Sequence, residues 1–316
     1  MPAERGAERG AGSDAGPFDG PVERAALLDR IDAHPLGDDP AAMRRTFDRL
    51  VLGDGGPDLS PDGVTVRADG TGLRVAPHGR AEDGAPPDAI WLHGGGYVFG
   101  SPETHLRAAA QMARTRDLDV ALPRYRLAPE HVWPAPLDDA LAAIATLAGD
   151  GPAPVLIGDS AGGHLALVTA LTLARAGRQV RGLVLFSPNT DRTGRSRTRQ
   201  AMDGDDPMVD DAGDRRLAEM CFHGRADDDP AVSPLLDDLS LLPPTWIEVG
   251  EPEVLLDDSR LLTERALRLG ADVRLRVTPG LLHMGQLWAP WWDPATTSLD
   301  RAAAFVRDVE GDLERA

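Results

Sequence analysis

The sequence contains no lysine, so all 33 of its basic residues are arginines. This absence excludes Schiff-base chemistry and a Ser–Lys dyad, and a base acting near neutral pH must then be a histidine or a carboxylate with a shifted pKa. Cysteine is almost absent as well, because Cys221 is the single one. An intrachain disulfide is therefore impossible, and we expect a cytoplasmic protein.

Long apolar runs are also missing. No stretch approaches the ~18 apolar residues of a membrane helix, and residues 1–20 carry charges and glycines where a signal peptide has an apolar core. Acidic residues outnumber basic ones by 51 to 33, which gives a net charge of −18. Nucleic acids and anionic membranes attract basic patches, so we expect neither as a partner.

The chain divides into a terminal segment, a helical pair and a long alternating region. Residues 1–20, rich in Gly, Ala and alternating charges, cannot bury enough surface to offset the entropy of ordering and are predicted to be disordered. Residues 21–55 contain the amphipathic patterns VERAALLDRI and PAAMRRTFDRLVL, which predict two helices. From residue 56 to residue 316, apolar strand patterns alternate with helical patterns.

This alternation predicts an α/β fold. Strands are expected at 64–67, 72–76, 88–93, 118–122, 154–158, 182–187, 245–249 and 273–277, and helices at 103–115, 137–148, 161–176, 256–269 and 298–314. Because the strands are nearly all apolar, they indicate a mostly parallel sheet covered by helices on both faces. In such sheets the reactive groups gather at the carboxyl ends of the strands.

Segment 190–232 interrupts the alternation. It is rich in Asp, Arg and Gly and contains one helical run, RRLAEMCF. A long excursion between two strands is often a functional lid. Its charges could favour a polar substrate, but a solvated face is the simpler interpretation; they include Arg192, Arg195, Arg197, Asp203, Asp205 and Asp206.

The strand PVLIG runs into GDSAGG and then into a helical pattern. This is the G-x-S-x-G motif in the strand–turn–helix context that it requires. A tight turn presents the Ser160 hydroxyl clear of the backbone, small neighbours let strand and helix approach closely, and the helix N-terminus lies near developing negative charge. We therefore predict that Ser160 is a nucleophile.

A second loop supplies hydrogen-bond donors. The strand DAIWLH ends in three glycines, which expose backbone N–H groups as an oxyanion hole requires. We assign this role to the N–H groups of Gly94 and Gly95, joined by that of Ala161, and expect His93 to organise the loop. A phosphate-binding loop is disfavoured, because the chain has no Walker lysine and this loop has no G-x-G-x-x-G.

The general base and its acid follow the last strands. Of the eight histidines, only His283 follows a late strand, as the chain order Ser, acid, His requires. Four carboxylates follow the strand TWIEVG: Glu251, Glu253, Asp257 and Asp258. The two aspartates fall within the first turns of a helix, where they act as capping or surface charges. Of Glu251 and Glu253, we favour Glu253, whose role is to orient and stabilise the protonated His283.

In these motifs the sequence resembles the hormone-sensitive lipase family of bacterial esterases. The matching segments are HGGGYVFGS (93–101), YRLAPEHVWPAPLDDA (125–140), GDSAGGHLA (158–166), SPLLDDLSLLPPTWIEVG (233–250), EVLLDDS (253–259) and PGLLH (279–283). The resemblance implies an eight-stranded α/β-hydrolase core, residues 56–316, under a helical cap built from residues 21–55 and about 190–232. Most members of the family have Asp as the acid, and this sequence has Glu253 in its place, as a branch of the family does. The resemblance also implies structural roles for Tyr125 and Glu130 beside the glycine loop.

These residues predict a serine carboxylesterase that acts through an acyl-enzyme and needs no metal or organic cofactor. The resemblance suggests short-to-medium acyl esters as substrates and makes a homodimer through the last strand and helix an option. Candidate pocket residues are Tyr97, Phe99, Asp159 and Trp288, although core packing is an equal alternative for the aromatic ones. Hydrolysis of a lactone, amide or carbamate, acyl transfer or cyclisation would use the same triad. A non-catalytic binder is disfavoured, because such homologues typically lose a triad member.

Overall fold

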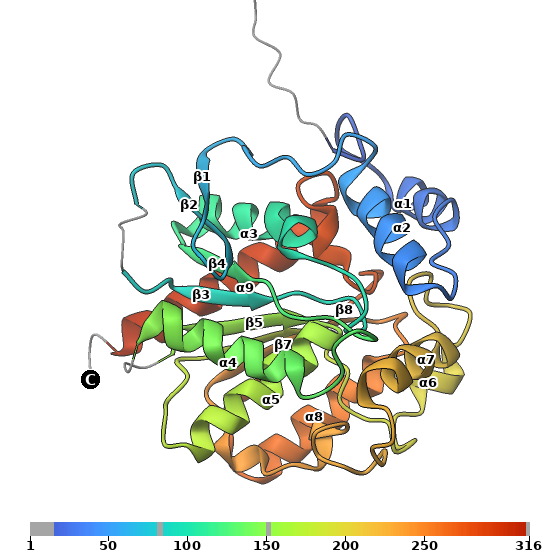
Figure 1. The fold of residues 1–316 in the computed structure, drawn as a ribbon, viewed down its shortest axis with the longest axis vertical. Helices are drawn as coiled ribbons and strands as arrows, with labels where there is room; N and C mark the ends of the chain where they lie inside the picture. Colours follow the sequence, from blue (N-terminus) through green and yellow to red (C-terminus); the bar gives the residue numbers. More distant parts are fainter. Residues whose placement is uncertain (1–15, 81–84, 150–152, 314–316) are drawn as a thin grey trace, which may run out of the picture.

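An eight-stranded sheet organises the chain (Figure 1). The computed structural model describes residues 16–80, 85–149 and 153–313. The strands are β1 (Val64–Ala68), β2 (Gly72–Pro77), β3 (Ala89–Leu92), β4 (Val120–Pro123), β5 (Val155–Asp159), β6 (Leu183–Phe186), β7 (Thr245–Gly250) and β8 (Val273–Thr278), in the order β1-β2-β4-β3-β5-β6-β7-β8. β2 pairs antiparallel with β1 and β4, and all other pairs are parallel. The predicted α/β-hydrolase fold is confirmed.

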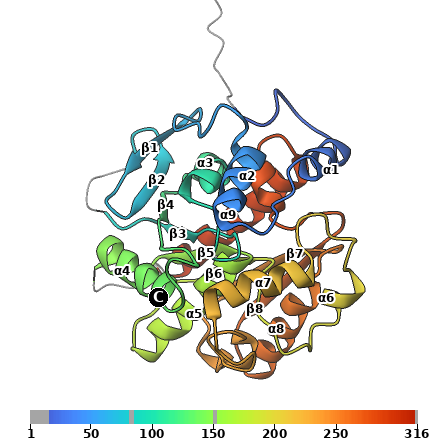
Figure 2. The ribbon, with the colours of Figure 1, turned by 45° about the vertical axis from the view of Figure 1, so that its right-hand side comes forward.

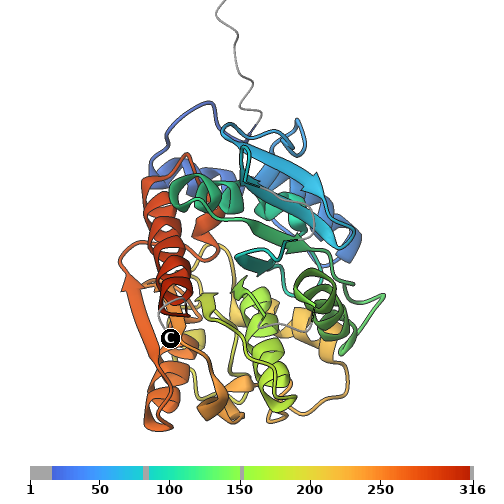
Figure 3. The ribbon, with the colours of Figure 1, turned by 90° about the vertical axis from the view of Figure 1, so that its left-hand side faces the viewer.

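Helices cover both faces of this sheet. α3 (Pro102–Arg116) and α9 (Asp293–Leu313) lie against each other on one face, and α4 (Ala135–Ala148), α5 (Ala161–Arg175) and α8 (Leu256–Arg268) lie on the other (Figures 1 and 3). Every residue of β3, β4, β5 and β6 is buried, which explains why these strands read as unbroken apolar runs. Figure 3 shows the β1–β2 hairpin and β8 at opposite edges of the twisted sheet.

Two helical pairs lie beyond the ends of the parallel strands. α1 (Arg24–Asp32) and α2 (Pro40–Leu52) form one pair, and α6 (Thr198–Ala201) and α7 (Asp211–Phe222) form the other (Figures 1 and 2). Asp39 accepts a hydrogen bond from the Ala42 N–H and Pro40 occupies the first turn, so α2 begins where the sequence predicts. α9 begins at Asp293, five residues before the predicted start, and α6 is an additional short helix in the insertion.

The predicted disordered segment, residues 1–20, lies outside the described residues except for 16–20. There the Phe18 ring packs edge-on against Trp288 and Trp291, with centroid distances of 6.2 and 6.1 Å. In the described part of the chain, no helix has both the length and the apolar character needed to cross a membrane.

Candidate active site

Ser160 lies at the turn between β5 and α5, in a conformation that few residues adopt. Its backbone has φ 53° and ψ −121°, and its N–H donates to the Phe186 carbonyl of the neighbouring strand at 2.9 Å. A positive φ is costly for a residue with a side chain and persists only where the surroundings over-determine it. Here it turns the Ser160 side chain out of the sheet and into a cavity.

The glycines of the turn are required by close backbone approach. A Cβ on Gly158 would lie 2.2 Å from the Gly162 carbonyl oxygen, and a Cβ on Gly162 would lie 2.1 Å from the Leu92 carbonyl oxygen. Both obstacles are backbone atoms, which cannot move aside as a side chain could. The motif therefore packs α5 directly against β5 and β3.

Ser160, His283 and Glu253 form a continuous hydrogen-bonded chain. The Nε2 of His283 lies 2.9 Å from the Ser160 Oγ, and its Nδ1 lies 2.8 Å from the Glu253 Oε2. A carboxylate only accepts, so Nδ1 carries a proton, and in the neutral imidazole the lone pair of Nε2 accepts from the Ser160 hydroxyl. The structure thus brings together three predicted residues that are 93 and 30 positions apart along the chain.

The second carboxylate oxygen of Glu253 also accepts hydrogen bonds. Its Oε1 accepts from the Ser187 hydroxyl at 2.8 Å and from the Gly250 N–H at 2.5 Å. Of the other carboxylates considered from the sequence, Glu251 is exposed and Asp258 is buried in a different cluster. Only Glu253 therefore meets the imidazole.

The electrostatic balance around His283 favours its charged form. Burial opposes the charge, but the hydrogen bond to Glu253 and the charges of Glu253, Asp206 and Asp159 outweigh it and raise the pKa of His283 to about 9. An imidazole beside ionised carboxylates is a strong proton acceptor, as a general base for a serine hydroxyl must be.

Asp159 anchors the glycine loop by a hydrogen bond to its first glycine. The Asp159 Oδ1 accepts from the Gly94 N–H at 3.1 Å and from the Trp91 indole N–H at 2.8 Å, while its Oδ2 lies 3.1 Å from the His105 Nε2. The Gly94 N–H therefore points away from Ser160, and the prediction that it stabilises an oxyanion is wrong. Gly95 and Gly96 instead line the cavity beside Ser160, and Gly96 was missed because the three glycines are equivalent in sequence.

A cavity of about 240 Å³ opens above Ser160 and His283. Most of its lining residues are apolar. The two helical pairs and the loops beside them contribute Ile31, Met43, Phe47, Leu50, Met208, Val209 and Leu217, and the loops after β3 and β8 contribute Phe99 and Met284. Its polar lining includes His34, Asp210, Asp214 and Arg216. The cavity thus lies between the N-terminal helices, the insertion and the reacting groups.

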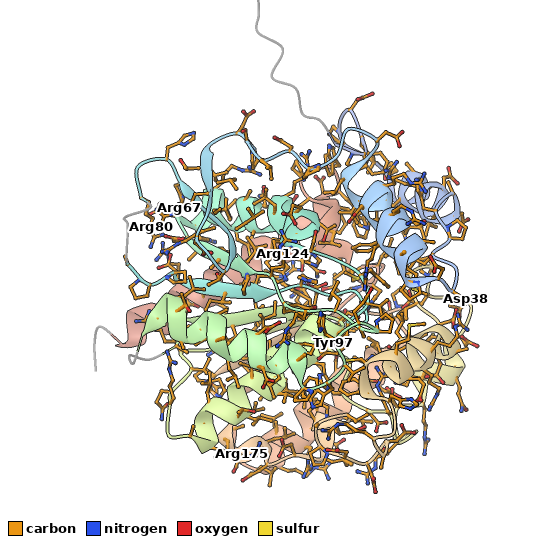
Figure 4. All side chains as sticks on the ribbon, viewed as in Figure 1. Asp38, Arg67, Arg80, Tyr97, Arg124 and Arg175 are labelled. Atoms are coloured by element: carbon orange, nitrogen blue, oxygen red, sulfur yellow. The ribbon has the colours of Figure 1, made fainter. Side chains whose placement is uncertain are left out.

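Of the predicted pocket residues, only Phe99 lines this cavity. Tyr97 lies in the interior (Figure 4), where its hydroxyl hydrogen-bonds the His164 Nδ1 at 2.5 Å. Trp288 is buried and packs against Phe18. Asp159 lies beneath the glycine loop, so the pocket prediction is wrong for these three residues.

Three groups of the kind that bind metals meet at the acid side of the site. Atoms of Asp206, Glu253 and His283 lie within 4.8 Å of one another. Both ring nitrogens of His283 are already engaged with Ser160 and Glu253, so we assign this cluster to proton chemistry.

Comparisons with known proteins agree with this geometry. A family model described as the α/β-hydrolase fold matches residues 89–287. The chain belongs to the α/β-hydrolase family. It is 30% identical over 295 residues to an acetyl-hydrolase of Streptomyces hygroscopicus, covering 92% of this chain and 97% of that protein. It is 32% identical over 285 residues to an esterase of Acinetobacter venetianus, covering 86% of this chain and 90% of that protein.

Solved structures identify the branch of the family. An esterase from the bacterial hormone-sensitive lipase family superposes with a TM-score of 0.79 at 30% identity, covering 91% of this chain and 99% of that chain. The resemblance to bacterial hormone-sensitive lipases is thereby confirmed, and the α/β-hydrolase is a carboxylic ester hydrolase.

The insertion of this α/β-hydrolase is joined to the core by buried ion pairs. The Arg199 guanidinium pairs with Asp258 at 2.9 Å and with Asp214 at 2.7 Å, and Arg192 pairs with Asp214 at 2.8 Å. Arg199 also lies 3.3 Å from Asp211, at the edge of this network. The sequence predicts a solvated face at Arg192, but this side chain is buried.

The N-terminal helices are joined to the glycine loop by a second contact. Arg44 on α2 donates to both carboxylate oxygens of Glu130, at 2.9 and 2.6 Å, and to the Val98 carbonyl at 2.8 Å. The Tyr125 hydroxyl donates to the His93 carbonyl at 2.6 Å. These contacts give Tyr125 and Glu130 the bracing positions that the family resemblance implies.

Proposed function

We propose that this carboxylic ester hydrolase is a serine esterase whose triad is Ser160, His283 and Glu253. The observation that carries the proposal is the hydrogen-bonded chain from the Ser160 Oγ through both ring nitrogens of His283 to the Glu253 carboxylate, at 2.9 and 2.8 Å. A hydroxyl is a weak nucleophile unless an adjacent base takes its proton, and this chain supplies that base in the correct tautomer.

The first half-reaction forms an acyl-enzyme. The Ser160 Oγ attacks the ester carbonyl carbon while His283 Nε2 takes its proton, and the carbonyl electron pair moves onto oxygen. When the tetrahedral intermediate collapses, the bond to the alcohol oxygen breaks and His283 returns the proton to that oxygen. Water then attacks the acyl-enzyme with His283 again as base, releasing the carboxylic acid and Ser160.

We propose that the N–H groups of Gly95, Gly96 and Ala161 stabilise the oxyanion. Gly95 and Gly96 line the cavity beside Ser160. Ala161 is the first residue of α5, where backbone N–H groups have no acceptor within the helix. Donors placed in advance where charge develops are the largest single contribution in many enzymes.

The cavity supports short-to-medium acyl esters as substrates. Its volume of about 240 Å³ lies below the ~300–1,000 Å³ typical of drug-sized ligand sites. We propose that the two helical pairs act as the cap that closes over it, because both contribute to its wall. A lactone, an amide or an acyl-accepting alcohol would be processed by the same groups, and comparing hydrolysis with transfer to added alcohols separates these reactions.

The direct test is hydrolysis of p-nitrophenyl acetate, butyrate, octanoate and palmitate by the wild type and by Ser160→Ala. Ser240→Ala, which removes an exposed hydroxyl, is the matched control. We expect turnover of the shorter esters, at least a ~10³-fold loss of kcat in Ser160→Ala, and normal activity in the control. Equal activity of wild type and Ser160→Ala would contradict the triad.

A homodimer, which the family resemblance makes an option, would have a candidate contact at the sheet edge. β8 has a neighbouring strand only on the β7 side within the described chain, and an unpaired edge can pair with another copy. Light scattering after size-exclusion chromatography distinguishes monomer from dimer. The cytoplasmic location stays a prediction from the sequence.

A further inference from the structure

A third carboxylate approaches the acid side of the triad from the insertion. Asp206 follows α6, its side chain is buried, and one of its oxygens lies within 4.8 Å of ligand-type atoms of both Glu253 and His283. Sequence patterns do not distinguish it from Asp203 and Asp205, yet those two neighbours are exposed. Only Asp206 is directed inward.

The carboxylate of Asp206 is fixed by backbone donors from two segments. Its Oδ1 accepts from the Met208 N–H at 3.0 Å, and its Oδ2 accepts from the Val254 N–H at 3.2 Å. Val254 follows Glu253, so Asp206 ties the insertion to the loop that carries the triad acid. Met208 lines the cavity, so one carboxylate links the cavity wall to the acid loop.

No arginine forms an ion pair with Asp206 among the residues that the structure describes. A buried carboxylate without a cation is costly, and the positive group that it faces is the imidazole of His283 once protonated. In the proposed catalytic step, neutral His283 acquires this charge by taking the proton of Ser160. The geometry therefore places a second negative group next to the charge that forms in the transition state.

We propose that Asp206 is a positioning residue for the triad, which stabilises protonated His283 by its charge and holds the Glu253 loop through the Val254 N–H. This inference rests on the proposed triad. The insertion would then have two roles: it lines the cavity, and through Asp206 it stabilises the charge on His283. Asp206 touches no reacting atom, and acts through His283 and Glu253.

The surrounding charges determine the sign of the expected effect. Glu253, Asp206 and Asp159 are the ionised groups that act on His283, from the loop after β7, the insertion and the end of β5. Burial raises the pKa of Asp206 to about 6, with a lowering contribution from His283 and a raising one from Glu253, so Asp206 is mostly ionised above neutral pH. Its removal takes away one of three groups that favour protonated His283, so the pKa of His283 should fall.

The experiment compares pH profiles of kcat/KM on p-nitrophenyl butyrate for the wild type, Asp206→Asn and Asp206→Glu. We expect the acidic limb of Asp206→Asn to move about 1 unit toward lower pH, as loss of a nearby charge implies, with kcat reduced more than KM is raised. Asp206→Glu, which keeps the charge, should restore the limb. If Asp206→Asn does not fold, Asp206→Ser, which keeps a hydroxyl acceptor without charge, takes its place.

Asp191→Asn is the matched control. Asp191 is a buried carboxylate of the same insertion that also accepts from backbone N–H groups, those of Thr193, Arg195 and Ser196. The main carboxylate contributions to the raised pKa of His283 come from Glu253, Asp206 and Asp159, and not from Asp191. The proposal would be overturned if the acidic limb of the kcat/KM profile lay at the same pH in Asp206→Asn as in the wild type. It would also be overturned if Asp191→Asn shifted this limb by as much as Asp206→Asn.

A second readout separates this proposal from the triad itself. Titration of ¹⁵N-histidine-labelled protein by NMR, with His283 assigned from the His283→Gln spectrum, measures the His283 pKa without turnover. If Ser160→Ala remains active, the proposed function fails, and this titration still tests Asp206. An unchanged His283 pKa in folded Asp206→Asn, or in Asp206→Ser where that variant replaces it, would reject the proposal whatever the activity shows.

Discussion

The Asp159 carboxylate accepts a hydrogen bond from the Gly94 N–H at 3.1 Å, and this contact joins the residue before the nucleophile to the first glycine of the loop beside it. The same carboxylate holds the Trp91 indole and lies against His105. It is wholly buried, so its bonds are shielded from water. The turn at Ser160 and the glycine loop are therefore one connected structure.

Asp159→Ala should lower kcat by about 10²-fold with little change in KM, because the glycine loop loses its anchor and its N–H donors shift. Steady-state kinetics on p-nitrophenyl butyrate test this. The control is Asp138→Ala, at an exposed position of α4. A folded Asp159→Ala with wild-type kcat would show that the loop keeps its geometry without the carboxylate.

Glu253→Gln should reduce kcat by about 10⁴-fold, because an amide facing His283 Nδ1 favours the wrong tautomer. Glu251→Gln changes an exposed carboxylate two residues earlier and should retain wild-type kcat. A similar loss in both variants would point to general disturbance of the loop, and no loss in Glu253→Gln would remove Glu253 from the triad.

The pH dependence follows from the raised pKa of His283. The base must be neutral to accept the Ser160 proton, so kcat/KM should rise with pH through the neutral range and level off only near the His283 pKa of about 9. Initial rates corrected for spontaneous ester hydrolysis, between about pH 6 and about pH 10, measure this limb. A plateau already complete at neutral pH would contradict the charge balance described for the site.

Breaking the buried ion network should be costly. Arg199→Met leaves the buried Asp258 without its cation, while Arg192 still pairs with Asp214, and should lower the free energy of unfolding by about 3–5 kcal/mol. Arg215→Met removes a partly exposed pair with Asp211 and should cost about 0–1 kcal/mol. Urea denaturation of both variants gives the comparison. An equal loss of unfolding free energy in the two variants would mean that a buried ion pair contributes no more to stability here than a partly exposed one.

Metal removal should leave the activity unchanged. Both nitrogens of His283 are engaged in hydrogen bonds, and the proposed acyl transfer uses only proton transfers and backbone donors. Dialysis against EDTA, followed by the p-nitrophenyl butyrate assay, tests this. A loss that added Zn²⁺ restores would instead assign Asp206, Glu253 and His283 to a metal.

Much of the site was predictable because its signals are local. The turn around Ser160 needs small residues at fixed spacing, and the chain order of Ser160, Glu253 and His283 follows from which strand each residue succeeds. All eight predicted strands are present, because apolar runs between turns leave few alternatives to a buried parallel sheet. These features require no knowledge of which segments meet in space.

Contacts between distant segments decided the rest. Gly94, Gly95 and Gly96 are equivalent as a sequence pattern, and it is a carboxylate 65 positions later that turns the Gly94 N–H away from Ser160. The charges of the insertion look solvated in sequence, yet Arg192 and Asp206 are buried because the folded insertion lies against the acid loop and α8. The sequence by itself determined the fold and singled out the three residues of the proposed triad, through local geometry and periodicity. Only the tertiary structure decided which polar groups face those residues, because burial and side-chain direction depend on what packs from elsewhere in the chain.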